Sequence, residues 1–163
     1  MPEGPSITVR TSSAQETEAL GRTLGRLLGP GDVVALTGEL GAGKTVLVRG
    51  IVSGAGSTAH VASPTFTLIR EYVGPVLLFH ADLYRLDSPV HLDDVGLDEI
   101  LERGGVVLIE WAEHAGAVLP PEHLWISMTF GAGEDERALR FTARGPRYTE
   151  VIRRMAEQGQ DRR

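Results

Sequence analysis

One eight-residue segment constrains the fold of this chain more than any other feature of its sequence. The segment is Gly38-Glu39-Leu40-Gly41-Ala42-Gly43-Lys44-Thr45, which matches the pattern G-x-x-x-x-G-K-[ST]. Glycines let backbone N–H groups curl around phosphates at a helix N-terminus, where the helix dipole favours anions. In such a loop a lysine, here Lys44, reaches the β- and γ-phosphates, and a hydroxyl, here that of Thr45, reaches a magnesium ion. We therefore expect Gly38 to Val46 to bind a nucleotide with Mg²⁺.

The residues around this loop favour the same interpretation over a chance glycine-rich turn. Val33 to Leu36 form a continuous apolar run, typical of a strand buried on both faces, and lead directly into Gly38. After the loop, apolar residues recur at helical spacing, which predicts a helix from about Lys44 to Ala55. Strand, glycine loop and helix are the order that a phosphate-binding loop requires.

The remaining patterns predict an α/β fold. Ser13 and Glu16 form a capping box for an opening helix, and apolar runs that end near acidic residues predict two further buried strands. We expect a P-loop NTPase-like, mainly parallel central sheet flanked by helices, with a C-terminal β-hairpin. The predicted later elements are strands at Val76–Phe79 and Val106–Ile109, a short helix at Leu92–Leu101, hairpin strands at Leu124–Phe130 and Ala138–Thr142, and a last helix at Tyr148–Glu157.

The composition excludes several classes of protein. The chain has no cysteine, which rules out disulfides, thiolate metal ligands and a cysteine nucleophile. Its 163 residues suffice for one domain, which we expect to span residues 1–163. A net charge of −6 argues against unaided binding to a phosphate backbone, which depends on clustered Lys and Arg. Because no apolar run approaches the roughly 20 residues that span a bilayer and no signal peptide precedes the fold, we expect a cytoplasmic protein without membrane contact.

Two carboxylates are candidates for the magnesium site. Glu110 follows the apolar run Val106–Ile109, and Asp82 comes soon after the run Val76–Phe79. A hard cation prefers oxygen ligands, and the ends of parallel strands meet at one edge of a sheet. We therefore expect Thr45, Asp82 and Glu110 to share a metal site, with Lys44 and the two acids as catalytic residues. Each acid could instead form an ion pair at a strand end, and Glu110 could polarise the attacking water.

The segment Ser63-Pro64-Thr65-Phe66-Thr67 links the phosphate-loop helix to the next strand. A linker in this position can be ordered by a γ-phosphate, as switch loops are in GTPases, but a proline-containing surface turn fits the same residues. Four further residues are close to the two acids in the sequence, namely His80, Tyr84, Arg85 and Trp111. Residue types alone leave their roles open.

Four motifs in this order resemble the bacterial TsaE (YjeE) family. Three of them are far more specific than the phosphate loop, and together the four cover roughly Gly38 to Glu113. The motifs are Gly38-Glu39-Leu40-Gly41-Ala42-Gly43-Lys44-Thr45, Ser63-Pro64-Thr65-Phe66-Thr67-Leu68, His80-Ala81-Asp82-Leu83-Tyr84-Arg85-Leu86 and Glu110-Trp111-Ala112-Glu113.

The resemblance implies an ATPase required for the threonylcarbamoyladenosine modification of tRNAs that read codons starting with adenine. It implies ATP/ADP and Mg²⁺ as ligands, and TsaD and TsaB homologues as partners. Carried over by motif, Ser63 to Thr67 resemble a nucleotide-sensitive switch that also contacts partners, and Trp111 resembles the aromatic residue next to the acid. The family also suggests that Thr17 lies by the adenine. The chain departs from it at Val46, where a second threonine is frequent, and beyond Glu113, which leaves Arg137 as a doubtful nucleotide contact.

Two other functions fit the same loop. A small-molecule kinase would need an acceptor pocket and usually a mobile lid that carries arginine, whereas the arginines of this chain are scattered. A nucleotide-gated binding module without turnover would more plausibly have lost Asp82 or Glu110. Because the chain is acidic, we expect any effect on tRNA to be indirect.

Overall fold

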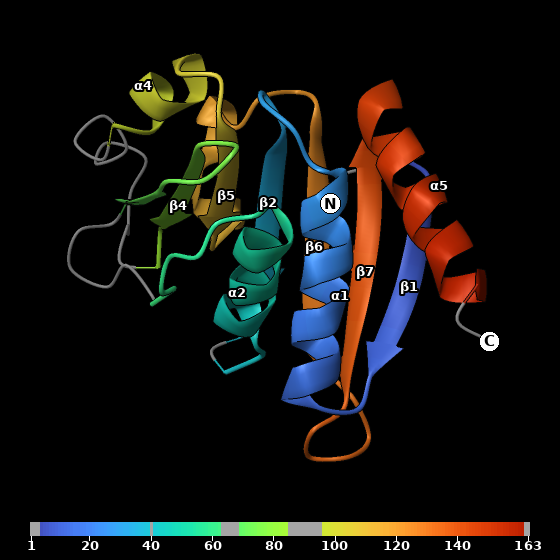
Figure 1. The fold of residues 1–163 in the computed structure, drawn as a ribbon. Coiled ribbons are helices and arrows are strands. Elements are labelled where there is room, and N and C mark those ends of the chain that lie inside the picture. Colours follow the sequence, from blue (N-terminus) through green and yellow to red (C-terminus); the bar gives the residue numbers. More distant parts are fainter. Residues whose placement is uncertain (1–3, 40, 63–68, 85–95, 162–163) are drawn as a thin grey trace.

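The computed structural model describes residues 4–39, 41–62, 69–84 and 96–161, in which seven strands form one sheet (Figure 1). The spatial order of the strands is β1-β7-β6-β2-β5-β4-β3. The described elements are β1 (Ser6–Thr11), α1 (Ala14–Leu27), β2 (Val33–Gly38), α2 (Lys44–Gly54), β3 (Ile69–Tyr72), β4 (Leu78–Asp82), α4 (Leu97–Glu102), β5 (Val106–Glu110), the 3₁₀ turns η2 (Ala112–His114) and η3 (Gly116–Val118), β6 (His123–Phe130), β7 (Arg137–Arg144) and α5 (Pro146–Asp161).

The sheet is mixed, which corrects the prediction of a mainly parallel one. The neighbouring strands β6, β2, β5 and β4 pair in parallel, but β1 with β7, β7 with β6, and β4 with β3 pair antiparallel. Parallel strands are covered on both faces, and β4 and β5 are accordingly buried along their whole length. The sheet therefore has a parallel centre with antiparallel margins on both sides.

The predicted C-terminal hairpin is present as β6 and β7, and it is part of the main sheet. Strand β6 continues the sheet because it also pairs in parallel with β2, from Val34 opposite Leu124 to Gly38 opposite Met128. The edge strand β1 then pairs with β7, an element that the sequence reasoning missed. As a result, the end of β6 lies beside the start of the phosphate loop.

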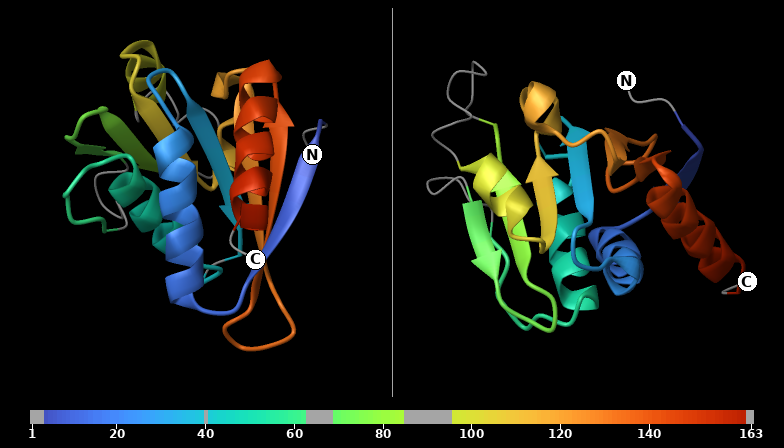
Figure 2. Two further views of the ribbon diagram at one scale, coloured as in Figure 1. Left: turned by 45° about the vertical axis from the view of Figure 1, so that its right-hand side comes forward. Right: turned by 90° about the horizontal axis from the view of Figure 1, so that it is seen from above.

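Side chains of the central strands alternate between two hydrophobic cores. Val34 and Leu36 of β2 face a large core with α1, α2 and α5, whereas Val33 and Ala35 face a smaller one that includes α4 and the η turns. This alternation follows from the two-residue period of a strand. In Figure 1 the helices α2, α1 and α5 lie in front of the sheet, and Figure 2 shows the same layers from two further sides.

Helices α1 and α2 approach each other at backbone contact. A Cβ atom added to Gly50 would lie 2.1 Å from the carbonyl oxygen of Glu18, and one added to Gly25 would lie 2.2 Å from that of Ile51. Gly21 and Gly54 are equally confined by the facing helix. Because only glycine permits this distance, the sequence of both helices fixes α2, whose first turn carries the phosphate loop, against α1.

Several predicted boundaries shift by a few residues. Helix α2 ends at Gly54, and α5 begins two residues earlier than expected, at Pro146. Of the helix predicted at 92–101, the structure has α4 at Leu97–Glu102, while residues 92–95 lie outside the described residues. Within the described part of the chain, no helix has the length and apolar character needed to cross a bilayer.

Candidate functional site

The phosphate loop joins the end of β2 to the start of α2, as the sequence predicts. Gly41 and Gly43 have φ angles of 83° and 102°, in the left-handed region that a residue with a Cβ seldom adopts. Gly43 is also the N-cap of α2, so the loop turns directly into a helix N-terminus. Leu40 lies outside the described residues. Two left-handed glycines therefore lead the described part of the loop into the N-terminus of α2, where free N–H groups favour an anion.

Lys44 is held inside the loop. Its side-chain nitrogen donates to the carbonyl oxygens of Gly38, at 2.5 Å, and Glu39, at 3.0 Å, and lies 4.4 Å from the centre of the Trp111 ring. Lys44 is only 5% exposed, and burial lowers the pKa of its ammonium group, with partial opposition from nearby carboxylates. An anionic ligand at the loop would place a further negative charge beside this ammonium and stabilise its charged form.

The two candidate acids end neighbouring strands and lie side by side. Asp82 of β4 is the register partner of Glu110 of β5, and the two residues are 8% and 3% exposed. The hydroxyl of Thr45 lies 3.4 and 3.5 Å from the two carboxylate oxygens of Glu110. Asp82 accepts a hydrogen bond of 2.9 Å from the backbone N–H of Tyr84. The structure therefore brings together Thr45, Asp82 and Glu110 at the mouth of the loop.

This donor set fits a magnesium ion that a nucleotide brings with it. Among the described residues, no group of three or more His, Cys, Asp or Glu side chains could hold a metal by itself. Magnesium in phosphoryl-transfer sites needs only one or two carboxylates and a hydroxyl, since phosphate oxygens and waters complete its shell. Thr45, Glu110 and Asp82 offer oxygen ligands of this kind and number.

Trp111 occupies a strained position directly after Glu110. Its φ angle of 56° makes it the one non-glycine residue with positive φ in the described ranges, and such strain concentrates at functional sites. Its ring packs on Tyr84 and His114, at centroid distances of 4.9 and 5.9 Å, and faces Lys44. Trp111 therefore contacts both Lys44 and the rings of Tyr84 and His114.

Two hollows flank the loop. A cavity of about 130 Å³ lies on the α1 side, where Arg137 of β7 donates from Nε to the carbonyl oxygen of Ala42 at 3.0 Å. Arg137 lies outside the family motifs, and the register of β7 with β6 brings it to the loop. The lining residues of this cavity are Ala14, Thr17, Gly41, Ala42, Gly43, Val46, Asp135 and Arg137.

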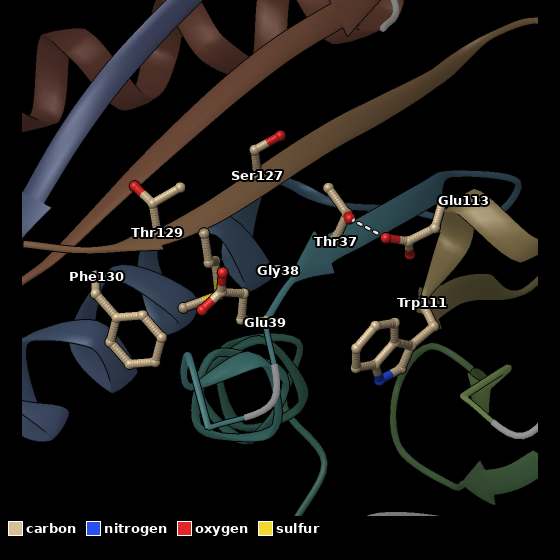
Figure 3. A pocket seen from close by; sticks show the side chains of 9 residues that line it. Thr37, Gly38, Glu39, Trp111, Glu113, Ser127, Thr129 and Phe130 are labelled. Atoms are coloured by element: carbon tan, nitrogen blue, oxygen red, sulfur yellow. Dashed lines mark hydrogen bonds between the residues drawn. The ribbon is translucent and has the colours of Figure 1, made fainter.

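The larger hollow is an open groove of about 770 Å³ on the other side of the loop. Figure 3 shows Trp111 and Phe130 on opposite sides of this groove, with Glu39 between them. The hydroxyl of Thr37 donates to Glu113 at 2.5 Å across its upper part. The lining residues are Thr37, Gly38, Glu39, Trp111, Glu113, Ser127, Met128, Thr129 and Phe130.

Two more polar side chains form a chain of contacts with Glu110. His80 contacts the Glu110 carboxylate through Nε2, and its Nδ1 lies 3.3 Å from the hydroxyl of Tyr72. His80 is close to the acids in the sequence, but its role could not be inferred from there. No sequence pattern pointed to Tyr72, which belongs to the edge strand β3. The predicted switch residues 63–67 and Arg85 lie outside the described residues.

The chain is similar to known proteins of one family. Residues 11–139 match the family model described as "Threonylcarbamoyl adenosine biosynthesis protein TsaE". A relative from Bacillus subtilis named tRNA threonylcarbamoyladenosine biosynthesis protein TsaE is 46% identical over 140 residues, which cover 85% of this chain and 87% of the relative. A relative of the same name from Treponema pallidum is 44% identical over 116 residues, or 71% and 86% of the two chains.

A solved structure gives the same result for the fold. The crystal structure of Bacillus subtilis YdiB superposes with a TM-score of 0.84 at 37% sequence identity, and the match covers 98% of this chain and 99% of that one. The mixed sheet described above is therefore shared along nearly the whole length. On the family match and these relatives, the chain belongs to the TsaE family of tRNA threonylcarbamoyladenosine biosynthesis proteins.

Proposed function

We propose that this chain is a Mg²⁺-dependent ATPase that serves as an accessory subunit in the threonylcarbamoyladenosine modification of tRNAs that read codons starting with adenine. It acts in the cytoplasm with TsaD and TsaB homologues. We expect it to hydrolyse ATP slowly by itself and faster in their presence. One observation carries the ATPase part: Lys44, Thr45 and Glu110 converge at the phosphate loop, with the Thr45 hydroxyl 3.4 Å from the Glu110 carboxylate. The assignment to the threonylcarbamoyladenosine pathway rests on the family match.

The ATP phosphates lie in the loop in this proposal. Lys44 exchanges the carbonyl oxygens of Gly38 and Glu39 for phosphate oxygens, which stabilise its ammonium charge better than two carbonyl groups. The base extends toward the smaller cavity near Thr17, where Arg137 contributes a cation beside the loop. The location of the cavity beyond Gly43, on the side away from the acids, supports this direction.

The acids supply the chemistry. When bound, the magnesium ion neutralises charge that develops on the β- and γ-phosphates. Thr45 and Asp82 contribute oxygen ligands, and Glu110 orients the water that attacks the γ-phosphorus and takes up a proton from it. The bond between the γ-phosphorus and the bridging oxygen breaks, and ADP and phosphate leave. Burial of Glu110 keeps bulk water away from its carboxylate.

Coupling to partners requires that bound ATP and bound ADP give the partner different contacts. Trp111 is suited to report the difference, because its ring contacts both Lys44 and Tyr84. A movement of the Lys44 ammonium toward a phosphate group changes its contact with that ring. The predicted switch Ser63 to Thr67 is the second part of this proposal. The effect on tRNA is indirect, so tight, salt-sensitive tRNA binding by this chain alone would contradict it.

A small-molecule kinase is the second candidate, and the open groove is the observation that favours it. At about 770 Å³ it has the size of a ligand pocket, and it borders the loop at Gly38 and Glu39. Within the described residues, however, no arginine lines it. A kinase would transfer the γ-phosphoryl group to an acceptor, whereas the proposed ATPase releases it as inorganic phosphate.

The test is phosphate release from ATP by the purified chain, alone and with TsaD and TsaB from the same source. We expect slow release alone, faster release with both partners, and complex formation in a pull-down that depends on ATP. The variant Lys44→Ala, carried through the same assays, is the control for contaminating ATPases. Absence of both association and stimulation would overturn the accessory role and leave the kinase hypothesis, to be tested by a search for an acceptor.

A further inference from the structure

His80 is a buried polar residue on an otherwise apolar strand. It belongs to β4, between Phe79 and Ala81, and is 0% exposed. Burial of an imidazole costs free energy unless its nitrogens are hydrogen-bonded. Both nitrogens are satisfied here, Nε2 by the Glu110 carboxylate and Nδ1 by the hydroxyl of Tyr72 at 3.3 Å. The imidazole thus stands between the acid of the site and a second polar side chain.

The partners of the ring define the direction of each hydrogen bond. An ionised carboxylate only accepts hydrogen bonds, so Nε2 of His80 carries the hydrogen and donates to Glu110. In a neutral imidazole the other nitrogen then accepts, which requires Tyr72 to donate its hydroxyl hydrogen to Nδ1. The same hydroxyl lies 3.4 Å from the carbonyl oxygen of Ala62, which competes for that single hydrogen.

We infer that His80 is the positioning residue for Glu110, and that Tyr72 holds the imidazole in the tautomer that this task needs. The inference rests on the proposed ATPase function. His80 donates a hydrogen bond to one carboxylate oxygen of Glu110, Oε2. Both carboxylate oxygens lie near the Thr45 hydroxyl, Oε1 at 3.4 Å and Oε2 at 3.5 Å, so the bond to Oε2 holds the carboxylate in this place beside the loop.

Without His80 the Glu110 carboxylate would lose this hydrogen bond, and the contacts that the described residues still offer it are those to Thr45, at 3.4 and 3.5 Å. A glutamate side chain held by contacts of that length can rotate, and misplacement of a group that orients water slows the reaction. Residues that hold a ligand or base from behind typically contribute about 10–100-fold to activity. We expect an effect of this size on kcat and little effect on ATP affinity.

Two substitutions of His80 separate its two contacts. The side-chain amide nitrogen of His80→Gln lies near the position of Nε2 and can still donate to Glu110, whereas that of His80→Asn lies near Nδ1 and can serve only Tyr72. Both amides are polar and uncharged, so the variants form a matched pair. The third variant, Tyr72→Phe, removes one hydroxyl and keeps the ring.

The experiment is steady-state ATP turnover of the three variants with the TsaD and TsaB partners, together with ATP affinity by calorimetry and thermal unfolding. We expect His80→Asn to lose about 10–100-fold in kcat at unchanged affinity, His80→Gln to recover most of that loss, and Tyr72→Phe to fall between them. Equal turnover of the Gln and Asn variants, or losses that follow the unfolding temperature, would overturn the positioning role.

A second measurement does not depend on turnover. Long-range ¹H–¹⁵N NMR spectra of the histidines report which nitrogen of His80 carries the hydrogen. We expect Nε2 to be protonated in the wild type and the balance to shift toward Nδ1 in Tyr72→Phe. Hydrogen on Nδ1 alone in the wild type would refute the inference even if ATP is hydrolysed. If the wild type fails to hydrolyse ATP with its partners, the proposed function fails while these spectra still decide the direction of the bond.

Discussion

The two regions that meet at the phosphate loop are held together by different interactions. On the helix side, α1 and α2 touch backbone to backbone, with a Cβ at Gly50 only 2.1 Å from the carbonyl oxygen of Glu18. On the acid side, the strands β3, β4 and β5 are joined by their backbone hydrogen bonds and also by contacts between buried polar side chains, those of Tyr72, His80 and Glu110. The first region depends on the absence of side chains and the second on their hydrogen bonds.

This difference separates the support of the site from its chemistry. Close packing is intolerant of any added atom but takes no part in binding or proton transfer. A buried hydrogen-bonded group is costly to bury and is retained where its position serves a reaction. We therefore expect changes on the helix side to alter stability, and changes on the acid side to alter turnover.

Lys44→Ala should have the largest effect, because this residue lies where both regions meet. The substitution removes the ammonium group that donates to the loop, and we expect ATP binding to be lost, a cost of about 2–5 kcal/mol. Calorimetric titration with ATP measures the loss. The matched control is Arg49→Ala, which removes one exposed cation from the same helix, and equal weakening in the control would contradict the assignment.

Asp82→Ala and Glu110→Ala should have the next largest effect. They act on the metal and the attacking water and not on the phosphate cradle, so we expect hydrolysis and its magnesium dependence to fall by about 100-fold or more while ATP still binds. Turnover over a range of Mg²⁺ concentrations is the measurement. The exposed acid Glu71 provides a control as Glu71→Ala. Unchanged turnover in both acid variants would refute the role of the acid side.

Gly50→Ala should have the smallest effect, and on stability alone. The new methyl group meets the carbonyl oxygen of Glu18, and overpacking of this kind costs about 1–3 kcal/mol of unfolding free energy. Gly29→Ala is the control, since no atom lies within 4 Å of its added Cβ. Urea unfolding compares the two variants, and the folded fraction of Gly50→Ala should keep its turnover. Equal stability of both variants would show that α1 and α2 can separate without cost.

Local patterns predicted much of the fold. The serine half of the capping box is confirmed, since the Ser13 hydroxyl accepts from the backbone N–H of Glu16 and α1 follows. The Glu16 carboxylate instead accepts from the backbone N–H of Ser12, one residue before the N-cap. The buried runs before Asp82 and Glu110 are strands, although the first begins at Leu78, two residues later than expected. Strand β1 was missed despite the alternating residues Ile7 and Val9, which an explicit search for a two-residue period would have found.

Strand β3 and the pairing of the marginal strands with the sheet could not be predicted in the same way. Strand β3 has four residues, of which Arg70 and Glu71 are exposed, and therefore carries almost no hydrophobic period. The arrangement of β6 between β2 and β7 depends on pairing between residues about 90 positions apart, such as Val34 and Leu124. Pairing of this kind leaves no mark in a short window of sequence.

The amino-acid sequence by itself determined the phosphate loop, because the left-handed angles at Gly41 and Gly43 and the helix start at Lys44 depend on neighbouring residues only. The tertiary structure alone decided which side chains surround Glu110. His80 and Tyr72 reach it through the registers of β4 with β5 and of β3 with β4. A shift of either register by one residue would turn these side chains to the opposite face, and such registers are selected by the packing of the whole sheet.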